Sequence, residues 1–143
     1  MKRSAFTMVE LIFVIVILGI LASIAVPKLT ATRRDAQITR YASDISTIRS
    51  AISTTRSENL LQGNPAFPPL EGLDATKLFE GVLTYPIQPA ADANGRGWTE
   101  VEAGKTYNLD IDGDDVTFTY STATGIFTCA IVEAGDLCSQ LIQ

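Results

Sequence analysis

The chain has 143 residues and a formal net charge of −5, with two cysteines and no histidine. This length predicts one compact domain besides any anchor, and the absence of histidine excludes imidazole acid–base catalysis and histidine-ligated metal sites. Up to Leu60 the chain contains eight basic and four acidic residues, and from Leu61 onward it contains three basic and twelve acidic residues. The acidic C-terminal part therefore argues against a nucleic-acid surface there.

The N-terminal segment 6–26 reads FTMVELIFVIVILGILASIAV, and its one charged residue is Glu10. As a helix it would be about 32 Å long, sufficient to cross a hydrocarbon core of about 30 Å. Lys2 and Arg3 precede the segment, which favours an orientation with the N-terminus in the cytoplasm. A charge at mid-bilayer depth costs about 2.5–3.5 kcal/mol on insertion scales, so Glu10 is expected to have a partner and a function.

These residues resemble the N-terminus of the type IV pilin family, which includes the pseudopilins of type II secretion systems. The resemblance implies that residues 1–5 are a leader and that a prepilin peptidase cuts between Ala5 and Phe6. It implies that the new amine of Phe6 is methylated and lies near Glu10 of a neighbouring subunit in a filament. The family leader usually ends in glycine, whereas this leader ends in Ala5.

Other interpretations of the N-terminus remain open. Ser23-Ile24-Ala25 loosely fits the rule for signal peptidase, which would cut before Val26 and release a soluble periplasmic binding domain. An uncut chain would be a single-span tethered domain that never polymerises. For Glu10 itself, the alternative to a partner is a carboxylate that reaches the cytoplasmic headgroups. Neither the released domain nor the tether explains the pattern of residues 6–10.

The segment 27–60 is predicted to continue the helix. Pro27 lacks an N–H group and should loosen the helix without ending it, and the resemblance gives Gly19 the same loosening role. Apolar residues then recur at helical spacing, at Ile38, Tyr41, Ile45, Ile48 and Ile52. A lone amphipathic helix is unstable in water, so this stripe is expected to pack on the C-terminal domain. A two-stranded coiled coil is the alternative.

The segment 61–143 is predicted to form a globular head. Gly63 and three following prolines end the helix, residues 74–80 are expected to form a short helix with Leu78 and Phe79 turned inward, and residues 84–98 are expected to form a loop. Alternating apolar residues then predict at least three antiparallel strands, at 107–111, 116–120 and 126–131, with turns at Asp112-Gly113 and Thr124-Gly125.

The predicted fold class is therefore α+β: a long N-terminal helix, transmembrane in its first half, packs its second half on a small antiparallel sheet. The resemblance implies the same ladle-shaped arrangement. Cys129 and Cys138 suit one disulfide in an oxidising compartment, with two free buried thiols as the alternative.

No catalytic set or nucleotide motif is present, so the chain is expected not to be an enzyme. Asp110, Asp112, Asp114 and Asp115 suggest calcium, which some major pseudopilins bind, but the EF-hand spacing is absent and an exposed acidic turn is favoured. No cofactor is therefore expected.

The sequence favours a structural subunit of a type II secretion pseudopilus, anchored in the inner membrane with its head in the periplasm. A type IV pilus or competence pilin is the alternative within the family. The implied partners are further pilin-like subunits, the membrane, prepilin peptidase and an inner-membrane platform driven by a separate ATPase.

Overall fold

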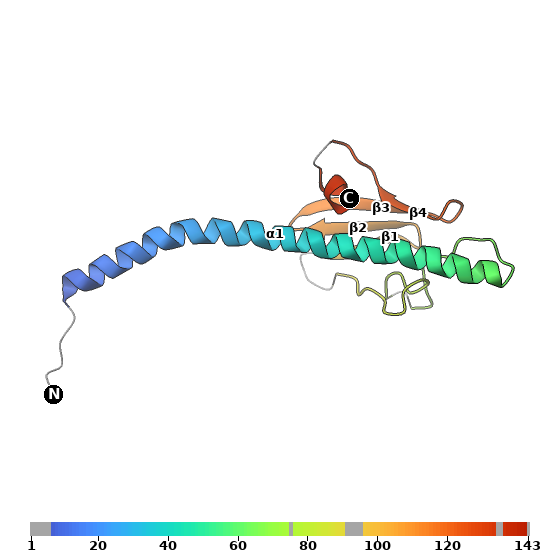
Figure 1. The fold of residues 1–143 in the computed structure, drawn as a ribbon, viewed down its shortest axis with the longest axis horizontal. Helices are drawn as coiled ribbons and strands as arrows, with labels where there is room; N and C mark the ends of the chain where they lie inside the picture. Colours follow the sequence, from blue (N-terminus) through green and yellow to red (C-terminus); the bar gives the residue numbers. More distant parts are fainter. Residues whose placement is uncertain (1–6, 75, 91–95, 134–135, 143) are drawn as a thin grey trace, which may run out of the picture. The chain divides into compact units, whose positions relative to one another are not determined.

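The structure is a computed structural model that describes residues 7–74, 76–90, 96–133 and 136–142. Along these ranges the chain forms helix α1 (Met8–Leu61), strands β1 (Gly97–Glu102), β2 (Thr106–Ile111), β3 (Asp114–Ser121) and β4 (Ile126–Cys129), and helix α2 (Leu137–Leu141) (Figure 1). The chain forms two compact units, and the boundary between them in the sequence lies between Ala36 and Gln37. Each unit is described below by itself.

Helix α1 has a defined signal at each end. At its start, the Thr7 side-chain oxygen accepts a hydrogen bond of 3.2 Å from the Glu10 N–H, so Thr7 is the N-cap. At its end, the Asn64 N–H donates to the Asn59 carbonyl at 2.9 Å, and Gly63 has a positive φ of 82°. This is a Schellman C-cap, which requires the left-handed backbone that glycine adopts at low cost. The predicted cap at Gly63 is confirmed.

The C-terminal unit contains one four-stranded antiparallel sheet in the order β1-β2-β3-β4. Burial alternates along β2 and β3: one face of each strand is buried, and the other is partly buried in β2 and exposed in β3. The helical stripe of α1 packs in the same core: Ile45, Ile48 and Ile52 are buried there, and Ile38 and Tyr41 pack beside them. The predicted α+β arrangement of helix and antiparallel sheet is therefore confirmed.

Phe79 lies at the centre of the core. Its ring centroid lies 5.6 Å from that of Trp98, 4.4 Å from that of Tyr107 and 5.7 Å from that of Phe127. Phe79 is 1 % exposed and has a φ of 61°, an uncommon conformation for a bulky residue. Packing of this ring therefore holds the backbone in a conformation that local preferences disfavour.

The short helix predicted at 74–80 is wrong. The Asp74 carboxylate accepts hydrogen bonds from the Thr76 N–H and hydroxyl, and Leu78 pairs with Ile87 in an isolated antiparallel bridge. A polar turn followed by strand pairing satisfies the backbone groups that a helix would otherwise use. The expectation that Leu78 and Phe79 turn inward is confirmed, since both are buried.

Two further boundaries differ from expectation. The predicted loop 84–98 extends too far, because β1 begins at Gly97 and its Trp98 pairs with Leu109 of β2. The predicted third strand 126–131 ends at Cys129, beyond which the chain leaves the sheet and reaches α2. The turn at Asp112-Gly113 is confirmed, with positive φ at both residues as a two-residue hairpin turn of this type requires.

Candidate functional site

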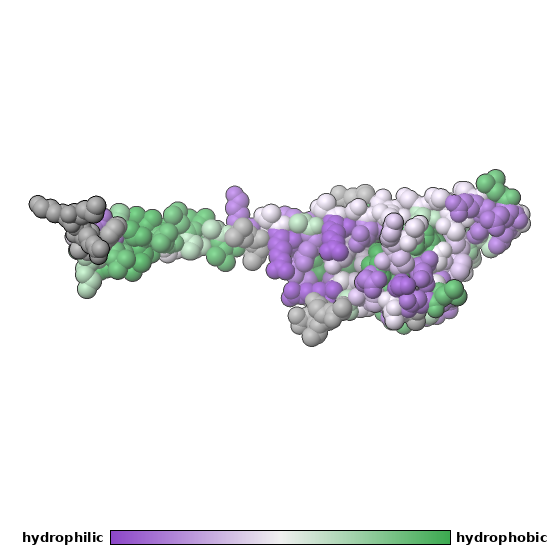
Figure 2. Space-filling view, turned by 90° about the horizontal axis from the view of Figure 1, so that it is seen from below, coloured by the Kyte–Doolittle hydropathy of each residue, from purple (hydrophilic) through white to green (hydrophobic). Residues whose placement is uncertain are grey.

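The first candidate site is the apolar first half of α1. Within the described part of the chain, Met8–Val26 is long and apolar enough to cross a membrane by length and composition. Figure 2 shows hydrophobic residues covering this part of the helix, and its large side chains are all exposed. Without lipid or a protein partner, so much exposed apolar surface would associate with other apolar surfaces. The segment therefore has the chemistry of a membrane anchor or of a helix packed among other helices.

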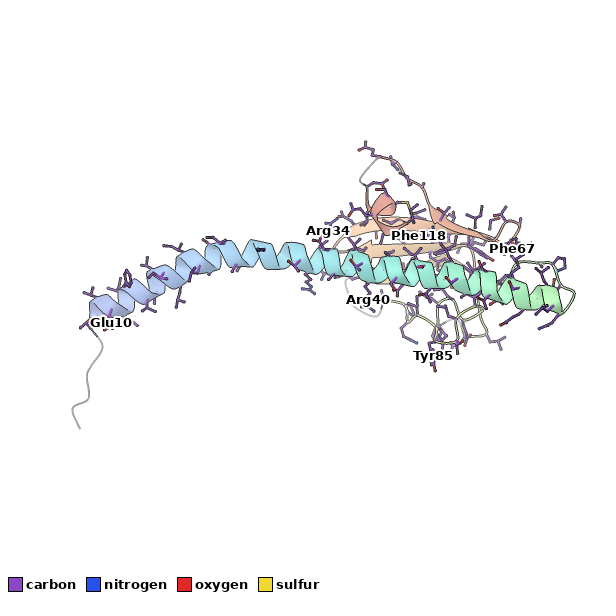
Figure 3. The ribbon with its side chains drawn as sticks, in the orientation of Figure 1. Glu10, Arg34, Arg40, Phe67, Tyr85 and Phe118 are labelled. Carbon is purple, nitrogen blue, oxygen red and sulfur yellow. A yellow bond between two sulfur atoms is a disulfide. The ribbon has the colours of Figure 1, made fainter. Side chains whose placement is uncertain are left out.

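Glu10 is the one charged residue in that segment, and it lies in the first turn of α1 (Figure 3). Because Thr7 is the N-cap, Glu10 occupies the third helical position, where a carboxylate interacts favourably with the helix dipole. The spacing Thr7–Glu10 is that of a capping box, a signal visible in the sequence that the sequence interpretation missed. The position of Glu10 therefore suits the start of a helix, besides any role in assembly.

The other N-terminal predictions have different outcomes. Ala5 and Phe6 lie outside the described residues, so the structure does not test cleavage or methylation there. Gly19 and position 27 both lie inside α1, which continues without interruption from Met8 to Leu61. The prediction that Pro27 does not end the helix is confirmed, whereas the loosening role of Gly19 and Pro27 stays a prediction.

Two hydrogen bonds attach the second half of α1 and the following loop to the sheet, and a cation–π contact attaches α1 to that loop. The Arg49 guanidinium donates to the Phe127 carbonyl of β4 at 3.0 Å. The Arg56 guanidinium lies 3.6 Å above the Phe67 ring, and the Tyr120 hydroxyl donates to the Pro68 carbonyl at 2.7 Å. No sequence pattern indicates these contacts, because none of them joins residues at the regular spacing of a helix or a strand.

Cys129 and Cys138 form a disulfide that joins the end of β4 to α2. The loop between them is organised by Asp136, whose carboxylate accepts hydrogen bonds from the N–H groups of Val132 at 2.7 Å and Ser139 at 2.7 Å. Asp136 is therefore both the N-cap of α2 and the centre of the loop. The sequence interpretation missed this residue and α2, although an aspartate before a short apolar run is an N-cap signal.

We expect replacement of both cysteines by serine to lower the free energy of unfolding of the C-terminal unit by about 2.5 kcal/mol. The two cysteines are separated by nine positions in sequence, and the disulfide between them restricts the unfolded chain. Urea unfolding followed by Trp98 fluorescence would measure the difference. Equal stability of the serine variant and the oxidised parent would contradict this expectation.

Asp136 also predicts a pH dependence. Hydrogen bonds from the Ser139 and Val132 backbone lower the pKa of Asp136 below its usual 3.8. A lowered pKa means that the folded chain holds this proton less tightly than the unfolded chain, so the contribution is complete above pH 3.8 and is lost as the pH falls through the folded pKa. We expect Asp136→Asn to lose less stability than the parent on acidification below pH 4. Parallel losses in acid-titrated thermal unfolding would refute this.

The aspartates at and beside the turn between β2 and β3 interact with neighbouring groups of the protein. Asp110 accepts a hydrogen bond from the Gly113 N–H at 3.2 Å, Asp115 accepts one from the Asn108 side chain at 2.9 Å, and Asp112 lies 3.8 Å from the Arg96 guanidinium. Among the described residues, no group of three or more acidic or cysteine side chains is arranged to hold a metal ion. Asp110 and Asp115 therefore have partners within the hairpin, and Asp112 has one in Arg96.

Comparison with known proteins gives independent information. Residues 1–26 match the model of a prokaryotic N-terminal methylation motif. The type II secretion system core protein G of Pectobacterium carotovorum is 38 % identical over 109 residues, which cover 76 % of this chain and 67 % of that protein.

Two fimbrial proteins are also similar to the chain. The type IV major fimbrial protein FimA of Dichelobacter nodosus is 31 % identical over 113 residues, covering 79 % of this chain and 66 % of that protein. A fimbrial protein of Pseudomonas aeruginosa is 27 % identical over 135 residues, covering 92 % of this chain and 87 % of that protein. The chain thus spans just under two thirds of the Dichelobacter protein. No solved structure matches the chain.

Proposed function

The chain belongs to the type IV pilin-like family, and from this premise we propose that it is a pseudopilin of a type II secretion system. As such it is a structural subunit and not an enzyme. It waits in the inner membrane with its head in the periplasm and is then lifted into a helical filament. The work of lifting subunits comes from a separate ATPase and membrane platform, because the chain has no nucleotide-binding motif.

The observation that supports assembly is the exposed apolar half of α1. Met8–Val26 has none of its apolar window buried within the chain, although the same helix contributes three buried isoleucines to the head. In the membrane, lipid covers these side chains. In a filament, the same segments of neighbouring copies cover one another. Burial between subunits then replaces burial in lipid, so assembly need not be strongly uphill.

The proposal includes processing at the N-terminus. Prepilin peptidase removes residues 1–5, and the new Phe6 amine is methylated and pairs with Glu10 of a neighbouring copy. A cation and an anion are each unfavourable in an apolar core, and together they offset part of that penalty and fix the axial register. The match of residues 1–26 to the methylation motif supports this step.

The choice of a pseudopilin over a fimbrial pilin is supported by sequence similarity. Identity is 38 % to the Pectobacterium core protein G, against 31 % and 27 % to the two fimbrial proteins. The longer alignment with the Pseudomonas fimbrial protein keeps a type IV pilus subunit as the second candidate. A strain lacking the chain should retain its surface pili and accumulate secreted enzymes in the periplasm; loss of pili with normal secretion would favour the second candidate.

The mature N-terminus tests the family mechanism. Intact-mass measurement and N-terminal peptide mapping of the membrane fraction should find a chain that starts at Phe6 with one extra methyl group. A chain starting at Val26 would identify an exported soluble domain, and a chain that keeps Met1 would identify a tether that does not enter filaments. Either result would overturn the proposal.

A further inference from the structure

A groove of about 490 Å³ lies on the C-terminal unit between the second half of α1 and the loop 82–87. Its helical wall is one stripe of α1, formed by Asp44, Thr47, Ala51, Thr54, Thr55 and Glu58. Its other wall is formed by residues 82–85 and Ile87. Tyr85, labelled in Figure 3, is 89 % exposed and projects from the loop at the side of this groove.

The groove offers hydrogen-bond acceptors and no cation among the described residues that line it. Asp44 and Glu58 provide carboxylates. The Thr47 hydroxyl donates its proton to the Ser43 carbonyl at 2.8 Å, and the Thr54 hydroxyl donates to the Ser50 carbonyl at 3.0 Å. Since these protons are already used, both hydroxyls present lone pairs to the groove. An occupant with several N–H donors and positive charge fits this lining.

Asp44 adds a reason for a cationic occupant. Burial raises the pKa of Asp44, and the charge of Arg40 and an interaction with the Trp98 side chain oppose only part of that effect. A half-buried carboxylate in this situation gains from a second cation, because charges interact more strongly away from bulk water. The apolar side chains of Ala51 and Leu83 in the same groove suit the aliphatic stems of lysine and arginine.

The chain itself contains a segment with this chemistry. Immediately after the apolar half of α1 come Lys28, Arg33 and Arg34, whose side chains are exposed. Residues 37–143 contain six basic and fourteen acidic residues, so heads packed side by side in a filament repel one another. The basic segment of a second copy would remove part of that repulsion.

We propose that the groove beside α1 receives the basic segment 28–34 of a second copy of the chain, with Lys28 or Arg33 pairing with Asp44 or Glu58. The inference rests on the proposed function, since it concerns subunits that meet in a filament. It identifies a contact between the C-terminal unit of one copy and the segment 28–34 of another, in addition to the packing of the apolar helices. The partner is recognised by charge complementarity between two surfaces of the same protein.

Zero-length carbodiimide coupling of assembled filaments tests this contact, because it joins an amine only to a carboxylate in direct contact with it. Filaments are assembled from mixed ¹⁴N- and ¹⁵N-labelled copies of the processed chain with Arg33→Lys, so that mass spectrometry distinguishes links between copies. We expect mixed-label peptides joining Lys28 or position 33 to Asp44 or Glu58. Filaments in which these amines couple to other carboxylates, or to none, would overturn the inference and leave the proposed function intact.

A second measurement uses paired variants. Asp44→Asn combined with Glu58→Gln should reduce filament yield at least tenfold, whereas Glu102→Gln combined with Glu133→Gln, which neutralises two exposed carboxylates outside the groove, should assemble normally. Normal assembly of the groove variant would overturn the inference. Absence of filaments from the wild-type chain would overturn the proposed function and this inference with it.

Discussion

Replacement of Glu10 by alanine is expected to abolish filament assembly while leaving membrane insertion intact. Under the proposed pairing, the variant leaves the Phe6 amine of a neighbouring copy buried without an anion. Removing one partner of a buried ion pair costs about 3–5 kcal/mol, which corresponds to a loss of filament yield of more than about 100-fold. Filament yield by electron microscopy, together with alkaline extraction of membranes, would measure both properties.

Thr7 and Glu10 also form the start of α1, so a matched control must separate assembly from capping. Glu10→Gln retains the length of the side chain and its capping function but removes the charge. If the ion pair is responsible, the glutamine variant assembles as poorly as the alanine variant. If helix capping is responsible, the glutamine variant assembles like the parent and the pairing with the Phe6 amine must be abandoned.

Replacement of Phe79 by alanine is expected to have the largest effect on the stability of the head. The Phe79 ring is 1 % exposed and contacts Trp98, Tyr107 and Phe127. Removing a buried phenylalanine side chain loses its transfer free energy and leaves a cavity, at a cost of about 3–5 kcal/mol. Urea unfolding in detergent, followed by circular dichroism, would measure the change in the free energy of unfolding.

The positive φ of 61° at Phe79 gives this prediction a second part. Alanine in a left-handed conformation is strained by about 1–2 kcal/mol, and glycine is not. Phe79→Gly is therefore expected to be more stable than Phe79→Ala by about 1 kcal/mol, although it removes one more carbon atom. The reverse order would show that the backbone at this position relaxes once the ring is gone.

Local patterns predicted the elements whose residues follow one period over many positions. The helical spacing of Ile38, Tyr41, Ile45, Ile48 and Ile52 predicted the buried stripe of α1, and alternation predicted β2 and β3. The cap at Gly63 and the turn at Asp112-Gly113 were predictable because each depends on a glycine at a position with positive φ. The N-terminal motif was readable for the same reason, since its residues are adjacent in sequence.

The failures were at segments whose structure depends on pairing and packing that no periodic pattern marks. Strand β1 is a strand because it pairs with β2, and only Trp98 in it is a large buried apolar side chain, so it has no alternating pattern to detect. The segment containing Leu78 and Phe79 was mistaken for a helix, because its pairing with Ile87 and its packing under the aromatic core outweigh local propensity. Asp136 and α2 were missed because a five-residue helix is too short for a period to be visible.

The sequence by itself determined the apolar helix with its single carboxylate, the amphipathic continuation, the antiparallel strands and the pair of cysteines. Each of these follows from residue types at short, regular spacings. The tertiary structure alone decided strand β1, the left-handed backbone at Phe79, the contacts from Arg49 and Arg56, and the acceptor-lined groove that contains Asp44 and Glu58. These features depend on which surfaces pack together in three dimensions, and no local pattern specifies which surface a segment will meet.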